Sequence, residues 1–390
     1  MKSKSKIILV ALVFGAYCCS PKGDGSVSIV DVGGSKMAVF NLNELKTDVA
    51  TIALSNFVEN WSMVQLESVE EAYVGRGVTM VTEKYIGIRQ SREPYKLFDR
   101  SGKFLRNIGG IGNGPGEWTI NLYDEIIDDE NELIYLAPFM RDRILVYSTS
   151  GQLVKELVAP HQLSKPKIFL SDGILTVVHM PFQDDRVFAF QFDVNTGEIL
   201  RELGPPPAHL IVQNFDSELF SSRNAQGIFD IIHTSSDTLY HFDVKNNKLL
   251  PAFTVDFFTS ERAWKRYYQL NKNMFLTDVR IYDENTRRFE DGDIIATDMT
   301  SLTSSRIKVV NDFLGNMSFG SIGGNSHNGY FVVNFQPEDL MEDIEKRLAE
   351  SGVSTSDREA LTKTLSTLKE GANNVVFIGK LKSEVKTKLW

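Results

Sequence analysis

The chain has 390 residues, a formal net charge of −9 and 42% hydrophobic residues. This composition excludes a disordered chain and provides enough apolar material for one large or two ordinary globular domains. The 25 phenylalanines and 12 tyrosines, with recurrent valine and isoleucine, favour an all-β fold.

The N-terminus predicts export. Three lysines in the first six residues precede a short uncharged run, residues 7–17, that ends at Cys18 and Cys19. The run is too short to span a bilayer as a helix and is typical of a signal peptide. These are the only two cysteines, so we expect no disulfide framework elsewhere. We predict a lipoprotein signal peptide at residues 1–18 with Cys19 as the lipidated residue; Cys18, or an ordinary signal with incidental cysteines, is the alternative.

Residues 19–28 are polar and contain glycine, as a tether between lipid and domain should be. Signal removal takes away three lysines and no acid, which changes the net charge from −9 to −12. No basic cluster follows, so we expect no nucleic-acid partner. The predicted location is the cell envelope, at the outer membrane, with the periplasmic and surface faces both open. The membrane would be contacted through the lipid anchor only.

A pattern of an aromatic residue, a polar turn and an alternating strand then recurs. Its copies begin at Phe98, Tyr147, Phe192 and Phe242, at spacings of 49, 45 and 50 residues. The turns contain Ser-Gly, Asn-Thr-Gly or Asn-Asn, which are typical of tight hairpins. Another strand precedes each copy. Four strands in 45 to 50 residues is the period of a β-propeller, and each copy is the predicted outer hairpin of a blade.

Two further blades are less regular. Residues 275–317 contain three strand-like segments, and "GYFVVNF" and "NNVVFIGKLK" would form the sixth blade. We therefore predict a six-bladed β-propeller over residues 29–390. The segments "SIVDV" and "MAVFNL", residues 28–32 and 37–42, are expected to pair with the last blade and close the ring.

A helical hairpin is predicted inside the last blade, at residues 337–371. Two apolar stripes with helical spacing support it, and a Ser356-x-x-Glu359 capping box would begin the second helix. The stripes consist of Leu340, Ile344 and Leu348, and of Leu361, Leu365 and Leu368.

The stretch "FLRNIGGIGNGPGEW", residues 104–118, is rich in glycine but lacks the Gly-Lys-Ser/Thr ending of a phosphate loop, and no helical run follows it. We interpret it as a blade-to-blade turn in which Gly112, Gly114 and Gly116 permit positive backbone angles. Glu117 would accept backbone hydrogen bonds, and Trp118 would pack between blades. The alternative is that Glu117 and Trp118 face a ligand at the mouth of the propeller.

These motifs together resemble the six-bladed β-propeller lipoproteins of Bacteroidetes, which are related in fold to NHL-type propellers. The resemblance covers the mature chain and is densest at residues 54–75, 95–118 and 235–243. Its most specific element is the Gly-x-Gly-Pro-Gly-Glu-aromatic order after the first outer hairpin, with Trp118 where the family more often has tyrosine or phenylalanine. The resemblance implies the fold and export more strongly than any activity.

The residues that could carry chemistry are dispersed. The six histidines show no metal-binding spacing, so no metal is predicted: His161, His179, His209, His233, His241 and His327. No Gly-x-Ser-x-Gly elbow is present. Six-bladed lactonases, however, hold calcium in the channel with acids and amides. The residues here that could do so lie near predicted strand ends, where an ordinary role in turns is the favoured interpretation: Asp128, Asp129, Asp172, Asp230 and Asn311.

An aromatic and basic stretch, "ERAWKRYYQLNKNMF", contains Trp264, Tyr267 and Tyr268. These rings could form a platform for sugar or peptide, or they could cover an inter-blade groove, which we favour. Our functional hypothesis is a non-catalytic, envelope-anchored propeller without a cofactor that binds a protein, peptide or glycan. The rival is a calcium-dependent, lactonase-like hydrolase that uses the central channel.

Overall fold

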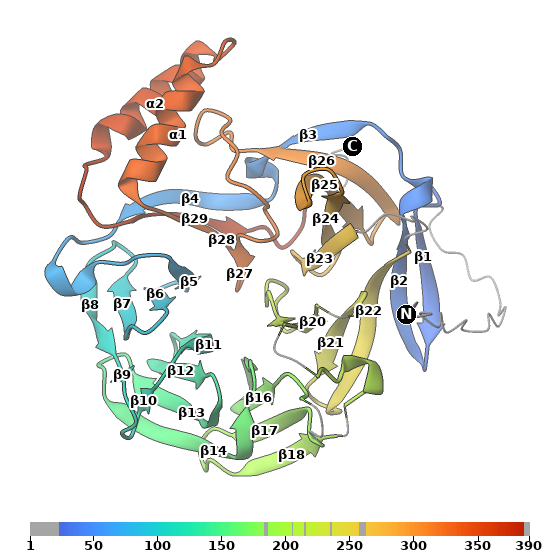
Figure 1. Cartoon of the computed structure of the whole chain (residues 1–390), viewed down its shortest axis with the longest axis vertical. Helices are drawn as coiled ribbons and strands as arrows, with labels where there is room; N and C mark the ends of the chain where they lie inside the picture. Colours follow the sequence, from blue (N-terminus) through green and yellow to red (C-terminus); the bar gives the residue numbers. More distant parts are fainter. Residues whose placement is uncertain are drawn as a thin grey trace.

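The computed structural model describes residues 23–385, apart from 183–185, 205, 214–215, 235 and 257–262. Six sheets are arranged around one axis (Figure 1), so the predicted all-β, six-bladed propeller is confirmed. No helix in the described ranges is long and apolar enough to cross a membrane.

Blades one to three follow chain order from the axis to the rim. Their outer two strands are the predicted repeat hairpins, and the turns place Gly102, Gly151 and Gly197 at φ of 88°, 89° and 78°, where glycine is favoured. Blade one is β5 (Gly77–Val81), β6 (Tyr85–Gln90), β7 (Tyr95–Asp99) and β8 (Phe104–Ile108); blade two is β11 (Leu122–Asp128), β12 (Leu133–Pro138), β13 (Arg141–Ser148) and β14 (Leu153–Leu163); blade three is β15 (Lys167–Ser171), β16 (Ile174–Val178), β17 (Ala189–Asp193) and β18 (Ile199–Leu203).

Blades four and five have the same four-stranded core. Blade four is β19 (Leu219–Phe220), β20 (Phe229–His233), β21 (Thr238–Asp243) and β22 (Lys248–Asp256); blade five is β23 (Ala263–Gln269), β24 (Met274–Asp283), β25 (Arg288–Asp298) and β26 (Thr303–Val310). The N-terminal strands β1 (Val27–Val32), β2 (Ser35–Asn41) and β3 (Val49–Ala53) extend these two blades at the rim. Ser26 and Val27, at the end of the predicted tether, are already buried.

The prediction that residues 28–32 and 37–42 pair with the last blade is wrong. Strand β2 instead runs parallel to β22, with Ala38 opposite Phe253. Ala38 and Phe40 are buried there with Phe253 and Phe275, whose rings stack at 4.6 Å between blades four and five. Strand β2 thus buries its apolar face against blades four and five, and not against blade six, where the ring closes.

Blade six contains the closure. Its strands are β27 (Ser326–His327), β28 (Tyr330–Phe335), β29 (Val375–Leu381) and β4 (Val58–Gln65). Residues from both ends of the chain therefore share one sheet, in which Val64 lies opposite Val376 on the antiparallel strand. The predicted pairing of "GYFVVNF" with "NNVVFIGKLK" is confirmed.

The helices α1 (Pro337–Ala349) and α2 (Thr355–Thr367) lie between β28 and β29, as predicted (Figure 1). The capping box was placed two residues too late, because Ser354 is the N-cap and accepts from Asp357 N at 3.0 Å. Both apolar stripes contribute to one cluster with blade six, whose buried members include Leu340, Ile344, Leu361, Leu368, Leu314, Met317, Val375 and Phe377.

Short elements complete the described chain. A two-stranded parallel ladder joins β9 (Gly110–Ile111) to β10 (Glu117–Trp118). The 3-10 helices of the described residues are η1 (Leu42–Glu44), η2 (Leu54–Asn56), η3 (Glu70–Ala72) and η4 (Ala208–Leu210).

Candidate functional site

Charged side chains meet where the inner strands approach the axis. We name this group the channel cluster; it consists of Arg89, Asp124, Glu125, Lys167, Arg223 and His327. Asp124 and Glu125 are consecutive in β11, so their side chains point to opposite faces of the strand. Asp124 consequently pairs with Arg223, whereas Glu125 pairs with Arg89.

Arg223 of blade four contacts three other blades. Its Nη1 and Nη2 atoms donate to Oδ2 and Oδ1 of Asp124, both at 3.0 Å. They also donate to the carbonyl oxygens of Ile168 at 2.6 Å and Glu125 at 3.2 Å, and Nη2 lies 2.7 Å from Nε2 of His327. Burial and the charge of Arg223 lower the pKa of His327 to about 3, so neutral imidazole accepts this hydrogen bond at pH 7.

The segment between β19 and β20 brings Arg223 to these partners. Asp230 accepts from the backbone N–H groups of Ser222 at 3.0 Å and Arg223 at 2.7 Å, and Arg223 has a φ of 51°. Asn328 N of blade six donates to Ser222 O at 2.8 Å. Blades two and six are not neighbours of blade four (Figure 1), so these contacts span the centre of the ring and hold it together.

Glu125 is fully buried and forms an ion pair with Arg89. Burial raises the pKa of Glu125, although Arg89 opposes this shift. Burial and the Glu125 charge raise the pKa of Tyr95 well above its usual value. The Tyr95 hydroxyl and both Glu125 oxygens form no hydrogen bond within the described ranges. Arg89 Nη1 donates to Leu122 O at 3.1 Å, which fixes the guanidinium between blades one and two.

Lys167 is a buried cation that has no ion pair with the described part of the chain. The residue is 8% exposed, and its Nζ donates to Tyr123 O at 2.8 Å and lies 5.8 Å from the Tyr123 ring centre. Burial lowers the pKa of Lys167 to about 8, although Asp124 opposes this shift. A buried ammonium costs free energy unless its charge is compensated. The nearby carboxylates of Asp124 and Glu125 supply part of that compensation.

A recess of about 240 Å³ lies between blades one and two, where β5 and β11 begin and β6 ends. We name it the Arg76 recess. Arg76 is exposed and forms no hydrogen bond or ion pair with the described residues. Two arginines and no acid line the recess, whose walls are Arg76, Gly77, Val78, Arg89, Gln90, Ser91, Asn121, Leu122 and Tyr123. One sign of charge in a concave site favours ligands of the opposite sign.

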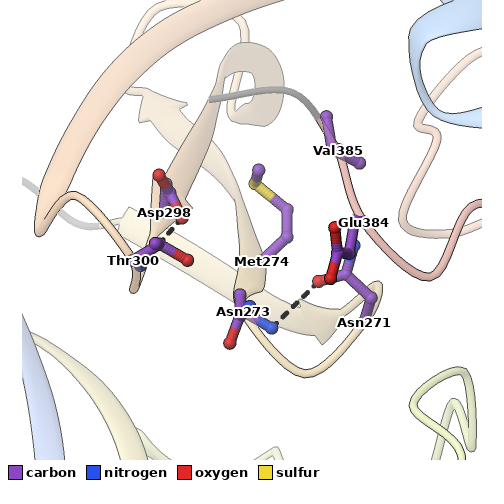
Figure 2. A pocket seen from close by; sticks show the side chains of 7 residues that line it. All are labelled: Asn271, Asn273, Met274, Asp298, Thr300, Glu384 and Val385. Carbon is purple, nitrogen blue, oxygen red and sulfur yellow. Dashed lines mark hydrogen bonds between the residues drawn. The ribbon is translucent and has the colours of Figure 1, made fainter. Parts of the chain in front are cut away.

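Other cavities have a different character. Figure 2 shows a pocket of about 290 Å³ on blade five, lined by Asn271, Asn273, Met274, Asp298, Thr300, Glu384 and Val385. It carries acids and amides but no base. Two of its oxygen atoms are already used by the local turns, because Asn273 N donates to Asn271 and Thr300 N donates to Asp298, both at 2.9 Å.

Two other cavities each have a volume of about 400 Å³. A groove beside blade five has aliphatic walls and charges of both signs, from Asp278, Arg280 and Lys308. A cavity between blades two, three, four and six is lined by Arg223 and Asn224, whose side chains already form hydrogen bonds with blades two and six. The Arg76 recess differs because the charged side chains that line it are both cations, Arg76 and Arg89.

Glu117 and Trp118 lie in β10, below the glycine turn. Glu117 Oε2 accepts from Gly114 N at 2.7 Å, which closes the turn on itself. Trp118 is fully buried in the cluster between blades one and two and presents no surface to a ligand. Gly116 has the expected positive φ, 74°, whereas Gly112 and Gly114 do not. A Cβ at Gly112 would overlap the Glu117 carboxylate, so a larger residue there would displace the Glu117 side chain from its present position.

Trp264, Tyr267 and Tyr268 lie in β23, the innermost strand of blade five. Tyr267 and Tyr268 are buried in two different clusters, one toward blade four and the other toward blade six. The structure therefore does not bring them together as one platform. The side chain of Trp264 lies outside the described part of the structure.

Several of the histidines and acids considered for metal binding form hydrogen bonds with other groups. His209 contacts the Tyr240 hydroxyl at 2.9 Å, and His241 contacts Gln269 at 2.7 Å. Asp128 and Asp129 accept hydrogen bonds in turns. Within the described ranges, no group of three or more His, Cys, Asp or Glu side chains is placed to hold a metal.

Sequence reasoning missed Arg76, Arg89 and Lys167. The available signal was a basic residue at the end of an inner strand that is otherwise apolar, as in "KIFLS" and "YIGIRQ". Cys18 and Cys19 lie outside the described residues, so the lipidation site stays a prediction.

The sequence model of a family described as "Domain of unknown function (DUF4934)" matches residues 37–380. No curated protein matches the chain. A solved structure of a Bacteroides fragilis protein described as a "putative exported protein" is similar, with 17% identity and a TM-score of 0.55 over 88% of this chain and 99% of that one.

Two further solved structures are less similar. A DUF4221 family member from Bacteroides vulgatus has 11% identity and a TM-score of 0.45 over 84% of this chain and 98% of its own. The Pan2 WD40 domain of Neurospora crassa has 13% identity and a TM-score of 0.37 over 63% of this chain and 85% of its own.

Proposed function

The chain belongs to the DUF4934 family, and from this premise we propose that it is an exported, lipid-anchored propeller that binds an anionic envelope partner, a peptide or a glycan, at the Arg76 recess. Export and the anchor rest on the signal-like N-terminus and on the similar fold of the Bacteroides fragilis protein described as exported. The binding role rests on one observation: an acidic chain places two arginines and no acid around one recess beside its channel.

The electrostatics of the recess support an anionic ligand. Arg76 has no hydrogen bond or ion pair with the described residues. A guanidinium offers two parallel donors to a carboxylate, so Arg76 provides direction as well as charge. Ligand binding would compensate the charge of Arg76.

Geometry at the channel argues for binding rather than hydrolysis. The acids that could activate water or hold calcium there are occupied, because Asp124 pairs with Arg223 and Glu125 pairs with Arg89. Asp230 is used to position the Arg223 segment. These contacts build the ring, and the recess beside them remains for a ligand.

The proposal is tested by titrating the exported chain, from Cys19 onward, with hexaglutamate, trigalacturonate and neutral dextran. We expect one of the anions to bind, dextran to give no signal, and affinity to fall about tenfold or more between 50 and 500 mM NaCl. Arg76→Ala should weaken binding about tenfold without changing the melting temperature. Lys363→Ala, which removes an exposed cation of α2, is the control. Absence of binding by both anions and by a peptide with a free terminal carboxylate would contradict the proposal.

A further inference from the structure

Two kinds of group line the Arg76 recess. Arg76 and Arg89 supply positive charge. Val78 is 43% exposed and supplies an aliphatic surface. Oδ1 of Asn121 accepts no hydrogen bond within the described ranges, but it is buried and offers no surface to a ligand. The recess thus offers cations and an aliphatic surface within one small volume.

Arg89 is prepared for a second carboxylate. Its Nε faces Glu125, and its Nη1 donates to Leu122 O. Nη2 forms no hydrogen bond with the described residues, so one atom of the fork is available to a ligand. The Glu125 ion pair holds the guanidinium in place, which reduces the entropy that a ligand would have to overcome.

One chemical unit complements both kinds of group. The last residue of a peptide carries a carboxylate and a side chain on a single Cα. A uronic acid has a carboxylate and hydroxyl groups but no aliphatic branch. An acidic residue within a peptide has its carboxylate at the end of a flexible stem and no aliphatic branch beside it.

The size of the recess agrees with one such unit. An apolar cavity of about 150 Å³ accommodates benzene in another protein. A volume of about 240 Å³ therefore admits a group somewhat larger than benzene, such as one terminal residue, and excludes a folded surface. The rest of the peptide would lie outside, over the face where β5 and β11 begin.

We infer that the Arg76 recess binds the carboxyl-terminal residue of a peptide whose last side chain is aliphatic. This inference rests on the proposed function and specifies its ligand. Arg76 and Arg89 bind the terminal carboxylate, and Val78 contacts the side chain.

The test uses N-terminally dye-labelled Gly-Ser-Gly-Ser-Val as a free acid and as a carboxyl-terminal amide, measured by fluorescence polarisation with the exported chain. We expect the free acid to bind at least about tenfold more tightly than the amide. A peptide ending in serine should bind several-fold more weakly than the valine peptide. Val78→Ser should remove this preference, and Arg76→Ala should weaken the acid but not the amide. Melting curves of both variants control for folding.

Equal affinity of the acid and the amide would overturn the inference. If hexaglutamate or trigalacturonate still bound in an Arg76-dependent manner, the proposed function would stand while the terminal-residue inference failed. If neither the peptides nor the two anions bound, both would fail.

Discussion

Arg223 stabilises the centre of the propeller at the cost of burying a charge. Its bidentate pair with Asp124 is satisfied on both sides, because Ile168 N also donates to Asp124 Oδ2 at 2.8 Å. Removing one partner of such a pair leaves the other charge buried without compensation. Asp124 is therefore the residue whose loss should affect stability most directly.

Asp124→Asn should destabilise the propeller by about 3–5 kcal/mol at pH 7, since the Arg223 guanidinium would stay buried without its carboxylate. Thermal melts followed by circular dichroism measure the effect, with Asp128→Asn, an acid in a partly exposed turn, as the matched control. Equal melting temperatures for the two variants would mean that Arg223 does not hold the blades together.

The same pair gives a pH dependence with a definite sign. Burial would raise the pKa of Asp124, but Arg223 and the other nearby positive groups lower it below its usual value of about 3.9. The pair therefore stabilises the protein above about pH 4, and this contribution is lost as pH falls through the lowered pKa. In Asp124→Asn that part of the acid loss should be absent, so the difference in melting temperature between the two proteins should shrink as the pH falls below about 4.

Some residue roles were predictable from the sequence, and others were not. The burial of Trp118 follows from an aromatic residue next to a turn at a blade junction. Arg76 lines the same recess as Tyr123, and Lys167 donates to the Tyr123 carbonyl. These positions depend on how blades one, two and three meet, and sequence spacing does not contain that geometry. The six-bladed ring was predictable because the repeat period is local.

Strand β4 is the element that closes the ring. It supplies the outer strand of blade six next to β29, whereas β1 and β2 only extend blade four. Closure by an N-terminal strand was predicted from the sequence, but it was assigned to residues 28–32 and 37–42 instead of β4. Pairing partners of equal hydrophobicity are not distinguished by pattern alone.

Truncation separates these roles. A chain that begins at Asp48 loses β1 and β2 and should still melt cooperatively, at a lower temperature, because Phe40 and Ala38 leave the blade-four core and loss of a buried phenylalanine costs about 3–5 kcal/mol. A chain that begins at Glu67 also loses β4 and should fail to melt cooperatively, since β29 becomes an open edge. If the second chain melted like the first, β4 would not be the closing strand.

The helical hairpin packs on blade six rather than standing apart. Replacing residues 337–371 with a short glycine-serine loop should leave a folded propeller. Its free energy of unfolding should fall by about a few kcal/mol, because the deletion exposes apolar surface at Val375 and Phe377. Circular dichroism should keep the strand signal and a cooperative transition. Loss of the transition would place the hairpin in the obligatory core.

The whole molecule combines a predicted lipid anchor at its N-terminus with a proposed binding face on the propeller. Changing Cys19 to Ala should release the protein from the membrane fraction and leave its melting temperature unchanged, because a lipid adds membrane affinity and no propeller contacts. Metabolic acyl labelling follows the anchor. Label that persists in this variant and disappears in Cys18→Ala would identify Cys18 as the acceptor, and label that persists in both would refute a lipoprotein.

The proposed binding face is defined by charge sign in a protein that is otherwise acidic. The most direct test is a charge reversal at Arg76, measured by calorimetric titration of the exported chain with hexaglutamate at pH 7. We expect Arg76→Lys to retain measurable binding, Arg76→Glu to abolish it, and Lys363→Glu, which changes the net charge equally but lies on α2, to bind like the unmodified chain. Equal loss in Arg76→Glu and Lys363→Glu, or unchanged binding in Arg76→Glu, would contradict the assignment of the recess as the ligand site.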